Sequence, residues 1–307
     1  MRKLIFHILL AYAITGMAQA CKVKQDIQQV KSGYVEVSGN ARIYYEEKGQ
    51  GTPIMLLHGH SLDTRMWNGQ FDEFAKHHRV VRFDFRGYGK SSEQTETFQF
   101  THLDDLLTLM DSLHIEKAHI VGLSMGGFIA GDMLGIAPER MLSCVLASGG
   151  PKTQKGPSEP MDGAEKAKRD IDIAALKAKG VDKMKEEWLE ALMASGGSRK
   201  ECMREPLRIM ITDWTAWQPL HKEVRLIYGM DAVKQLKQKC PTVPTLILEG
   251  GAPGNKHSGK SWLTEFLPNS RVEVLPDCGH MMNIEQPELF NKAVLDFINK
   301  NGVMDIW

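Results

Sequence analysis

The sequence predicts an α/β protein with a mostly parallel, doubly wound sheet and an inserted helical cap. Short apolar runs, most of them followed by glycine or proline, recur along the chain, and helical segments separate them. One long interval, 151–239, contains no convincing strand and consists of Lys- and Glu-rich helical stretches. Of 307 residues, 42% are hydrophobic, which is enough for one large core. We therefore expect a single core formed by 21–150 and 240–307, with 151–239 as the cap.

The first twenty residues have the three parts of an export signal. Two basic residues precede an apolar stretch at about 4–14, and an A-x-A cleavage site ends at Ala20. The apolar stretch is shorter than the roughly 20 residues of a membrane span. We expect 1–20 to be removed and the protein to be secreted or periplasmic; an uncleaved or disordered terminus is the alternative. A lipid anchor at Cys21 is less favoured, because Ala18 stands where bacterial lipoprotein signals usually have leucine.

Strands and helices then follow in order. Alternating stretches at 34–38 and 41–47 predict a half-exposed hairpin. Continuous apolar runs suit strands that are buried on both faces. These runs lie at 54–58, 80–85, 118–122, 142–147, 245–249 and 271–275. Helical patterns lie between or after them, at 71–78, 102–114 and 287–300.

Charge and cysteine content exclude several classes of protein. Lys plus Arg and Asp plus Glu both number 38, so no global field favours nucleic acid. The cysteines after Cys21 show no metal-ligand spacing, and Cys144 suits a small buried hydrophobic position. We expect no cofactor and no metal.

A candidate nucleophile, Ser124, lies in the stretch "HIVGLSMGGFIA". Gly122 to Gly126 fit G-x-S-x-G, after a predicted strand and before a helical run. A sharp strand-to-helix turn lifts a serine hydroxyl clear of the backbone and needs small neighbours to close. The same turn aims the backbone N–H of Met125 at a substrate carbonyl oxygen.

The other parts of such a site can be placed along the chain. In "LLHGHS", the backbone N–H of His60 is positioned to be the second oxyanion donor. His58 and His60 as metal ligands are a weaker alternative, because the segment has no carboxylate or cysteine beside them. Serine needs a base, and His280 is the candidate: it lies between a glycine and the closing helix, at the carboxyl end of the sheet.

Five segments together resemble the α/β-hydrolase superfamily. They are "LLHGHS", "FDFRGYGKSS", "VGLSMGGF", "VPTLILEGG" and "CGHMMNIEQPE", in that order. The resemblance extends from about Ser32 to Lys300 and implies a capped member of the superfamily. It implies Ser124 as nucleophile, His280 as general base and acid, and the N–H groups of His60 and Met125 as oxyanion donors. It also implies structural roles for Asp84, Arg86, Gly87 and Gly89 in one loop, and for Glu285 and Pro287 before the last helix.

The sequence departs from the family at the third member of the triad. The family usually has an Asp three positions after the residue that corresponds to Gly250, where this chain has Pro253. The other family position, after "CVLA", offers Ser148, Gly149 and Gly150, and none of these is acidic. Glu249 is the nearest carboxylate and our candidate for the third residue. Asn255 is an uncharged alternative, and Asp277 is expected on the outer side of its loop.

Two functions remain in competition. The first is a serine hydrolase that cleaves a small carboxylic ester or lactone through an acyl-enzyme at Ser124. The second is a hydrolase-like ligand-binding or receptor protein with little or no turnover, which the missing acid favours. Trp188, Trp214 and Trp217 in the cap suggest a substrate with an apolar group, although packing between cap and core explains them as well.

Overall fold

The structure, a computed structural model, describes residues 29–95, 98–151, 162–221, 232–255 and 261–301. The segment 1–20 and Cys21 lie outside these residues, so the export signal and the lipid anchor stay predictions. None of the described helices combines the length and the apolarity that a membrane crossing requires.

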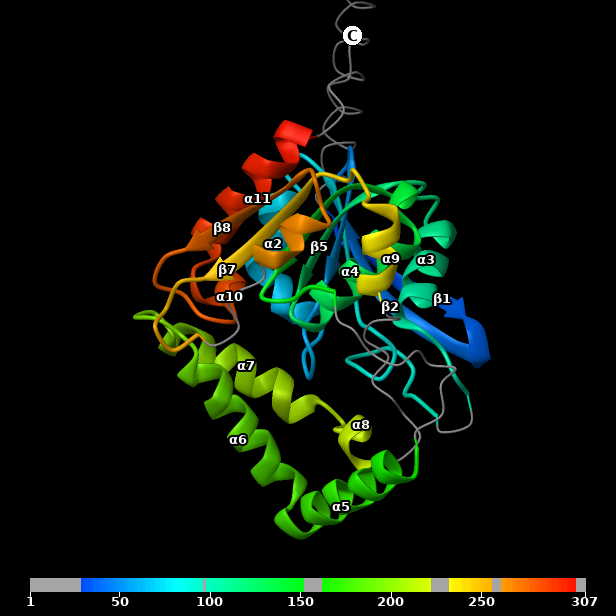
Figure 1. The fold of residues 1–307 in the computed structure, drawn as a ribbon, viewed down its shortest axis with the longest axis vertical. Helices are drawn as coiled ribbons and strands as arrows, with labels where there is room; N and C mark the ends of the chain where they lie inside the picture. Colours follow the sequence, from blue (N-terminus) through cyan, green and yellow to red (C-terminus); the bar gives the residue numbers. More distant parts are fainter. Residues whose placement is uncertain (1–28, 96–97, 152–161, 222–231, 256–260, 302–307) are drawn as a thin grey trace, which may run out of the picture.

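Within the described residues, one eight-stranded sheet has the order β1-β2-β4-β3-β5-β6-β7-β8 (Figure 1). The pairs β1–β2 and β2–β4 are antiparallel, and all the other pairs are parallel. The strands are β1 (Lys31–Val37), β2 (Ala41–Lys48), β3 (Pro53–Leu57), β4 (Arg79–Phe83), β5 (Ala118–Leu123), β6 (Met141–Ala147), β7 (Thr245–Gly250) and β8 (Ser270–Leu275). The predicted hairpin and all six apolar runs are therefore strands, and the mostly parallel sheet is confirmed. The expected burial on both faces is wrong for β8, which is an edge strand and is buried only at Leu275.

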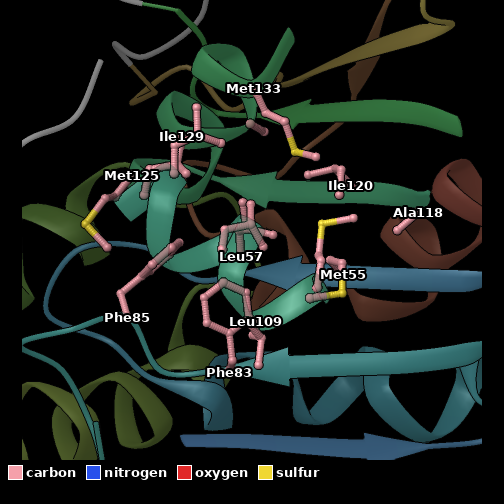
Figure 2. Close-up of a cluster of buried hydrophobic side chains, with 14 of the residues drawn as sticks. Met55, Leu57, Phe83, Phe85, Leu109, Ala118, Ile120, Met125, Ile129 and Met133 are labelled. Carbon is pink, nitrogen blue, oxygen red and sulfur yellow. The ribbon is translucent and has the colours of Figure 1, made fainter. Parts of the chain in front are cut away.

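Helices cover both faces of the sheet. Successive side chains of a strand point to opposite faces, so each face carries apolar side chains that helices bury, and two cores result. One core joins Met55, Phe83 and Ile120 to α3 (His102–Ser112) and α4 (Met125–Ile136), as Figure 2 shows for Leu109, Ile129 and Met133. The opposite core joins Leu56 and Val121 to α2 (Asn68–Phe74) and α11 (Pro287–Asn301). The sheet is thus doubly wound.

The cap helices lie at one end of the sheet, away from both helix layers (Figure 1). They are α5 (Gly163–Lys179), α6 (Val181–Ala194), α7 (Glu201–Asp213) and α8 (Trp217–Leu220). One more helix of the segment 151–239, α9 (Ala232–Lys239), packs against α4 instead. Its buried Val233 and Leu236 lie three residues apart on one face, and Leu236 belongs to the core between the sheet and α4. This helix therefore covers the sheet.

The remaining elements are short. They are η1 (Ser38–Asn40), η2 (Thr64–Trp67), η3 (Pro138–Arg140), η4 (Ser261–Glu265) and α10 (Met282–Glu285). Of these, η2 follows the loop after β3 and α10 follows the loop after β8, so both lie beside the carboxyl ends of the parallel strands.

Candidate active site

Ser124 occupies a strained turn between β5 and α4. Its backbone has φ 57° and ψ −114°, and its N–H donates to the carbonyl of Ala147 at 2.9 Å. A non-glycine residue in such a conformation costs on the order of 1–3 kcal/mol, and such strain clusters at functional sites. The side chain remains partly exposed where its neighbours are buried. The predicted strand, serine and helix are therefore present, and Ser124 is partly exposed at the turn.

The glycines of the motif allow three backbones to meet. A Cβ at Gly122 would lie 2.2 Å from the carbonyl oxygen of Gly126, and a Cβ at Gly126 would lie 2.0 Å from that of Leu57. Real Cβ atoms do not approach backbone so closely, so α4 can start directly against β3 and β5 only with glycine at these positions. Met125, the first residue of α4, thus has its N–H in the helix's first turn, beside Ser124.

We expect Gly126→Ala to lower the free energy of unfolding by about 3 kcal/mol or more, because the new methyl group meets rigid backbone. Gly163→Ala is the matched control. Gly163 begins α5 with nothing within 4 Å of an added Cβ, so its variant should be neutral or slightly more stable. Urea unfolding measures both. Equal stability of the two variants would contradict the close approach of α4 to β3.

The loop after β3 lies against Ser124. A Cβ at Gly59 would be 3.5 Å from the Cβ of Ser124. The buried His58 holds this loop from beneath: its Nδ1–H donates to the Gly59 carbonyl at 2.8 Å, and its Nε2 accepts from the Phe85 N–H at 3.0 Å. Both ring nitrogens thus bond to backbone. His58 therefore links the loops after β3 and β4 through these two hydrogen bonds, a role that the sequence did not suggest.

Burial lowers the pKa of His58 from its ordinary 6.5 to about 4, because the charged ring would have no water around it. The unfolded chain therefore binds a proton between these pH values that the folded chain does not. This part of the stability is complete above pH 6.5 and is lost as the pH falls to 4, by roughly 3 kcal/mol in all.

We expect the free energy of unfolding to fall with decreasing pH between 6.5 and 4, and to fall less steeply in His58→Gln. The difference in slope should approach about 1.4 kcal/mol per pH unit, the value for one proton. Urea titrations at several pH values measure it. Parallel slopes for the two proteins would show that His58 is not held neutral.

The side chain of His60 points into an aromatic cluster rather than toward a metal. Its Nδ1 is 2.8 Å from the hydroxyl of Tyr88, and its ring meets those of Trp214 and Trp188 edge-on, at 4.8 and 6.2 Å. Burial lowers the pKa of His60 to about 4. Two of the three cap tryptophans therefore pack on the loop that the sequence assigned to the oxyanion hole. Trp217 stacks on His221 within the cap, at 3.9 Å.

The loop that carries His280 reaches back from β8 toward the loop after β3. His280 is 5% exposed, and the following α10 contacts η2 and α2: the side chain of Asn283 donates to the carbonyl of Met66, and the side chain of Gln70 donates to that of Asn283, both at 3.0 Å. In the sheet, β5 lies between β3 and β8. The His280 loop is therefore anchored on both sides of the position of Ser124.

Glu285, which the resemblance made structural, has two roles. Its fully buried carboxylate accepts the N–H of Gly279, directly before His280, at 2.8 Å. It also accepts the N–H of Gly197, in the cap, at 2.7 Å. Glu285 therefore joins the histidine loop to the cap as well as preceding the last helix, which begins at Pro287.

The loop after β4 is built around buried charges, as the resemblance implied. Asp84 accepts the N–H groups of Thr64 and Lys90 at 2.7 and 2.8 Å, while burial raises its pKa to about 6. Arg86 makes a two-pronged ion pair with the buried Asp105, at 2.7 and 3.0 Å. Gly87 and Gly89 both have positive φ there. These groups shape the loop and lie outside the nucleophile's turn.

Two candidates for the third triad residue lie near the end of β7, in different directions. Glu249 is within the strand, where alternation places it on the same face as Ile247, toward α4. Asn255 is buried, and its Nδ2 donates to the carbonyl of Gly250 at 2.9 Å. A Cβ at Gly250 would lie 2.9 Å from that Nδ2 and 2.4 Å from the carbonyl oxygen of Gly279.

Asn255 therefore shares the small space at Gly250 with the residue that precedes His280. Asp277, by contrast, is exposed and bonds to Ser198, as its expected outward position requires. The assignment of Glu249 stays a prediction.

Comparison with known proteins agrees with this architecture. The family model described as "Alpha/beta hydrolase family" matches residues 54–293. The chain is 26% identical to the dihydrolipoyllysine-residue acetyltransferase component of the acetoin cleaving system of Pseudomonas putida, over 95% of this chain and 80% of the relative. It is also 26% identical to the pimeloyl-[acyl-carrier protein] methyl ester esterase of Pectobacterium carotovorum, over 84% and 98%.

Among solved structures, a thermophilic esterase from Thermogutta terrifontis superposes with a TM-score of 0.70 at 25% identity. The match covers 88% of this chain and 99% of the esterase. The family model spans most of the chain, and the fold matches that of this esterase. The protein therefore belongs to the alpha/beta hydrolase family.

Proposed function

We propose that the protein is a serine hydrolase that cleaves a small carboxylic ester or lactone through an acyl-enzyme at Ser124. The observation that carries the proposal is the strained turn at Ser124, with the Gly59 loop against its side chain. A turn that served packing alone would not require a non-glycine residue at positive φ with a partly exposed hydroxyl. Esterases among the similar proteins support an ester as substrate.

In the proposed reaction, Oγ of Ser124 attacks the ester carbonyl while His280 accepts the hydroxyl proton. The backbone N–H groups of His60 and Met125 donate to the oxyanion. His280 then gives its proton to the leaving alcohol as the carbon–oxygen bond breaks. Water, deprotonated by His280, attacks the acyl-enzyme. As the bond to Oγ breaks, His280 returns this proton to Oγ, which releases the acid and restores Ser124. No cofactor enters these steps.

We propose Asn255 as the group that orients His280, because its amide lies beside Gly279 whereas the strand directs Glu249 toward α4. An amide fixes the ring but cannot stabilise the imidazolium that forms during attack. Asn255→Ala removes the amide, and we expect it to lower turnover about tenfold or more.

Glu249→Gln is the matched variant and is expected to be nearly silent. Turnover of a nitrophenyl ester by folded protein measures both. If Glu249→Gln lowers turnover by on the order of 10²–10⁴ while Asn255→Ala has no effect, Glu249 is the orienting group, as the sequence suggested.

Nitrophenyl esters with acyl chains of graded length test the function and define the substrate class. We expect hydrolysis with a preference for apolar acyl groups, because the rings of Trp188 and Trp214 lie beside His60. Folded protein that hydrolyses no ester of the series and forms no adduct with a fluorophosphonate would favour the ligand-binding alternative. In that case, ester binding without turnover would be measurable by calorimetry.

A further inference from the structure

The cap contacts the core at the loop that carries the predicted oxyanion donor, His60. The indole N–H of Trp188, on α6, donates to the hydroxyl of Ser61 at 2.7 Å. The same hydroxyl donates to the carbonyl of His60. Ser61 is buried and has φ 63°, a conformation that its surroundings must maintain. A side chain of the cap therefore contacts, through one hydroxyl, the peptide that follows the predicted oxyanion donor.

The C-terminal end of α6 contacts the loop that carries His280. Ser195, the C-cap of α6, accepts the backbone N–H of His280 through its hydroxyl at 3.3 Å. Two residues further, the N–H of Gly197 and that of Gly279 share the carboxylate of Glu285. Ser198 then bonds to Asp277, through both its N–H and its hydroxyl. Together these hydrogen bonds hold the backbone from Asp277 to His280.

The two attachments lie in the C-terminal half of α6 and at its C-cap. Trp188 and Ser195 are seven residues apart, which is about 10 Å along a helix axis. The oxyanion loop follows β3 and the histidine loop follows β8, strands that lie on opposite sides of β5 in the sheet, and α6 makes hydrogen bonds to both loops. Each attachment is a hydrogen bond to backbone or to a residue in a fixed turn, so it restrains position more than an apolar contact does.

We infer that α6 is a positioning element that fixes the His60 peptide and the His280 loop relative to Ser124. The inference rests on the proposed function, because it assigns catalytic meaning to the two loops. It adds that the cap stabilises the transition state as well as enclosing the substrate. Removing the hydrogen bond between Trp188 and Ser61 should therefore lower kcat while leaving KM little changed.

Trp188→Phe tests the inference, because it keeps an aromatic ring near His60 while it removes the N–H donor and one ring of the indole. We expect kcat to fall by on the order of 10–100-fold, the cost of a small misplacement of a catalytic group. Ser61→Ala should lower kcat by a similar factor. The double variant should be no slower than the slower single variant, since both substitutions remove the same hydrogen bond. Trp217→Phe, whose ring stacks on His221, is the matched control.

Two further readouts separate positioning from general loosening. A thionoester has a sulfur that accepts hydrogen bonds weakly, so it gains little from an oxyanion hole. The ratio of ester to thionoester turnover should therefore fall in Trp188→Phe and stay constant in Trp217→Phe. Hydrogen exchange in the peptide spanning 57–64 should accelerate only in Trp188→Phe and Ser61→Ala.

The outcomes are distinguishable. If the ratio and the exchange are the same in Trp188→Phe as in Trp217→Phe, while the wild type is an active esterase, the positioning role of α6 is wrong. If the wild type hydrolyses no ester, the proposed function fails. Exchange still decides the structural part in that case: acceleration confined to 57–64 supports the restraint by α6, and unchanged exchange refutes it.

Discussion

Replacing Ser124 by alanine is expected to lower ester turnover by on the order of 10⁴–10⁶ while the fold is retained. The loss is large because the hydroxyl forms the covalent intermediate, and the oxyanion donors alone leave only a small residual rate. Initial rates on the best nitrophenyl ester measure the loss, and circular dichroism confirms folding. Retention of most of the activity by the folded variant would exclude Ser124 as the nucleophile.

Ser124→Gly is an informative companion to this variant. Glycine adopts φ 57° without steric cost, so this variant should unfold at a higher urea concentration than Ser124→Ala and be equally inactive. Such a result would show that the chain tolerates strain at this residue for the sake of its side chain. Equal stability of the two variants would mean that the turn stores no strain.

Replacing His280 by glutamine is expected to have an effect of similar size, on the order of 10⁴–10⁶ in turnover. Glutamine fills the buried position and can form hydrogen bonds, but it cannot take up the proton of Ser124. The same ester assay measures the loss. The loop is held by hydrogen bonds from the backbone N–H groups of Gly279 and His280, which the substitution leaves in place, so this variant should remain folded.

The double variant Ser124→Ala with His280→Gln tests whether the two residues act together. A nucleophile and its base form one unit, so the double variant should be no slower than either single variant. Multiplication of the two losses would show that His280 acts elsewhere in the protein. His280 would then be a structural residue of the loop.

The order of strands and helices could be predicted from the sequence because each signal is local. Apolar runs such as 54–58 and 245–249 are buried on both faces, and their glycine or proline neighbours mark where each strand ends. The turn at Ser124 could be predicted for the same reason, since strand, glycines and helix are contiguous. The relation of α9 to the sheet could not, because its Lys-rich sequence resembles that of the cap helices and only the packing of Leu236 separates them.

The connections around the site depend on residues that are far apart in the chain. Trp188 meets Ser61 across 127 positions, and Gly197 meets Glu285 across 88. Helical spacing indicates which face of α6 is buried, but it does not indicate which polar group an indole will find there. The role of His58 could not be predicted either. The motif around it suggests a backbone role for its neighbours, and its own ring bonds to the backbone of Phe85, in the loop after β4, 27 residues away.

The most direct test of the central claim is the site at which a fluorophosphonate attaches. The folded protein is treated with the reagent, and intact mass and peptide mapping are recorded for the wild type and for Ser124→Ala. We predict a single adduct on the peptide that contains Ser124, absent from Ser124→Ala, because an activated serine attacks phosphorus as it attacks a carbonyl carbon. A folded wild type that remains unmodified, or an adduct that persists in Ser124→Ala, would contradict the assignment of Ser124 as the nucleophile.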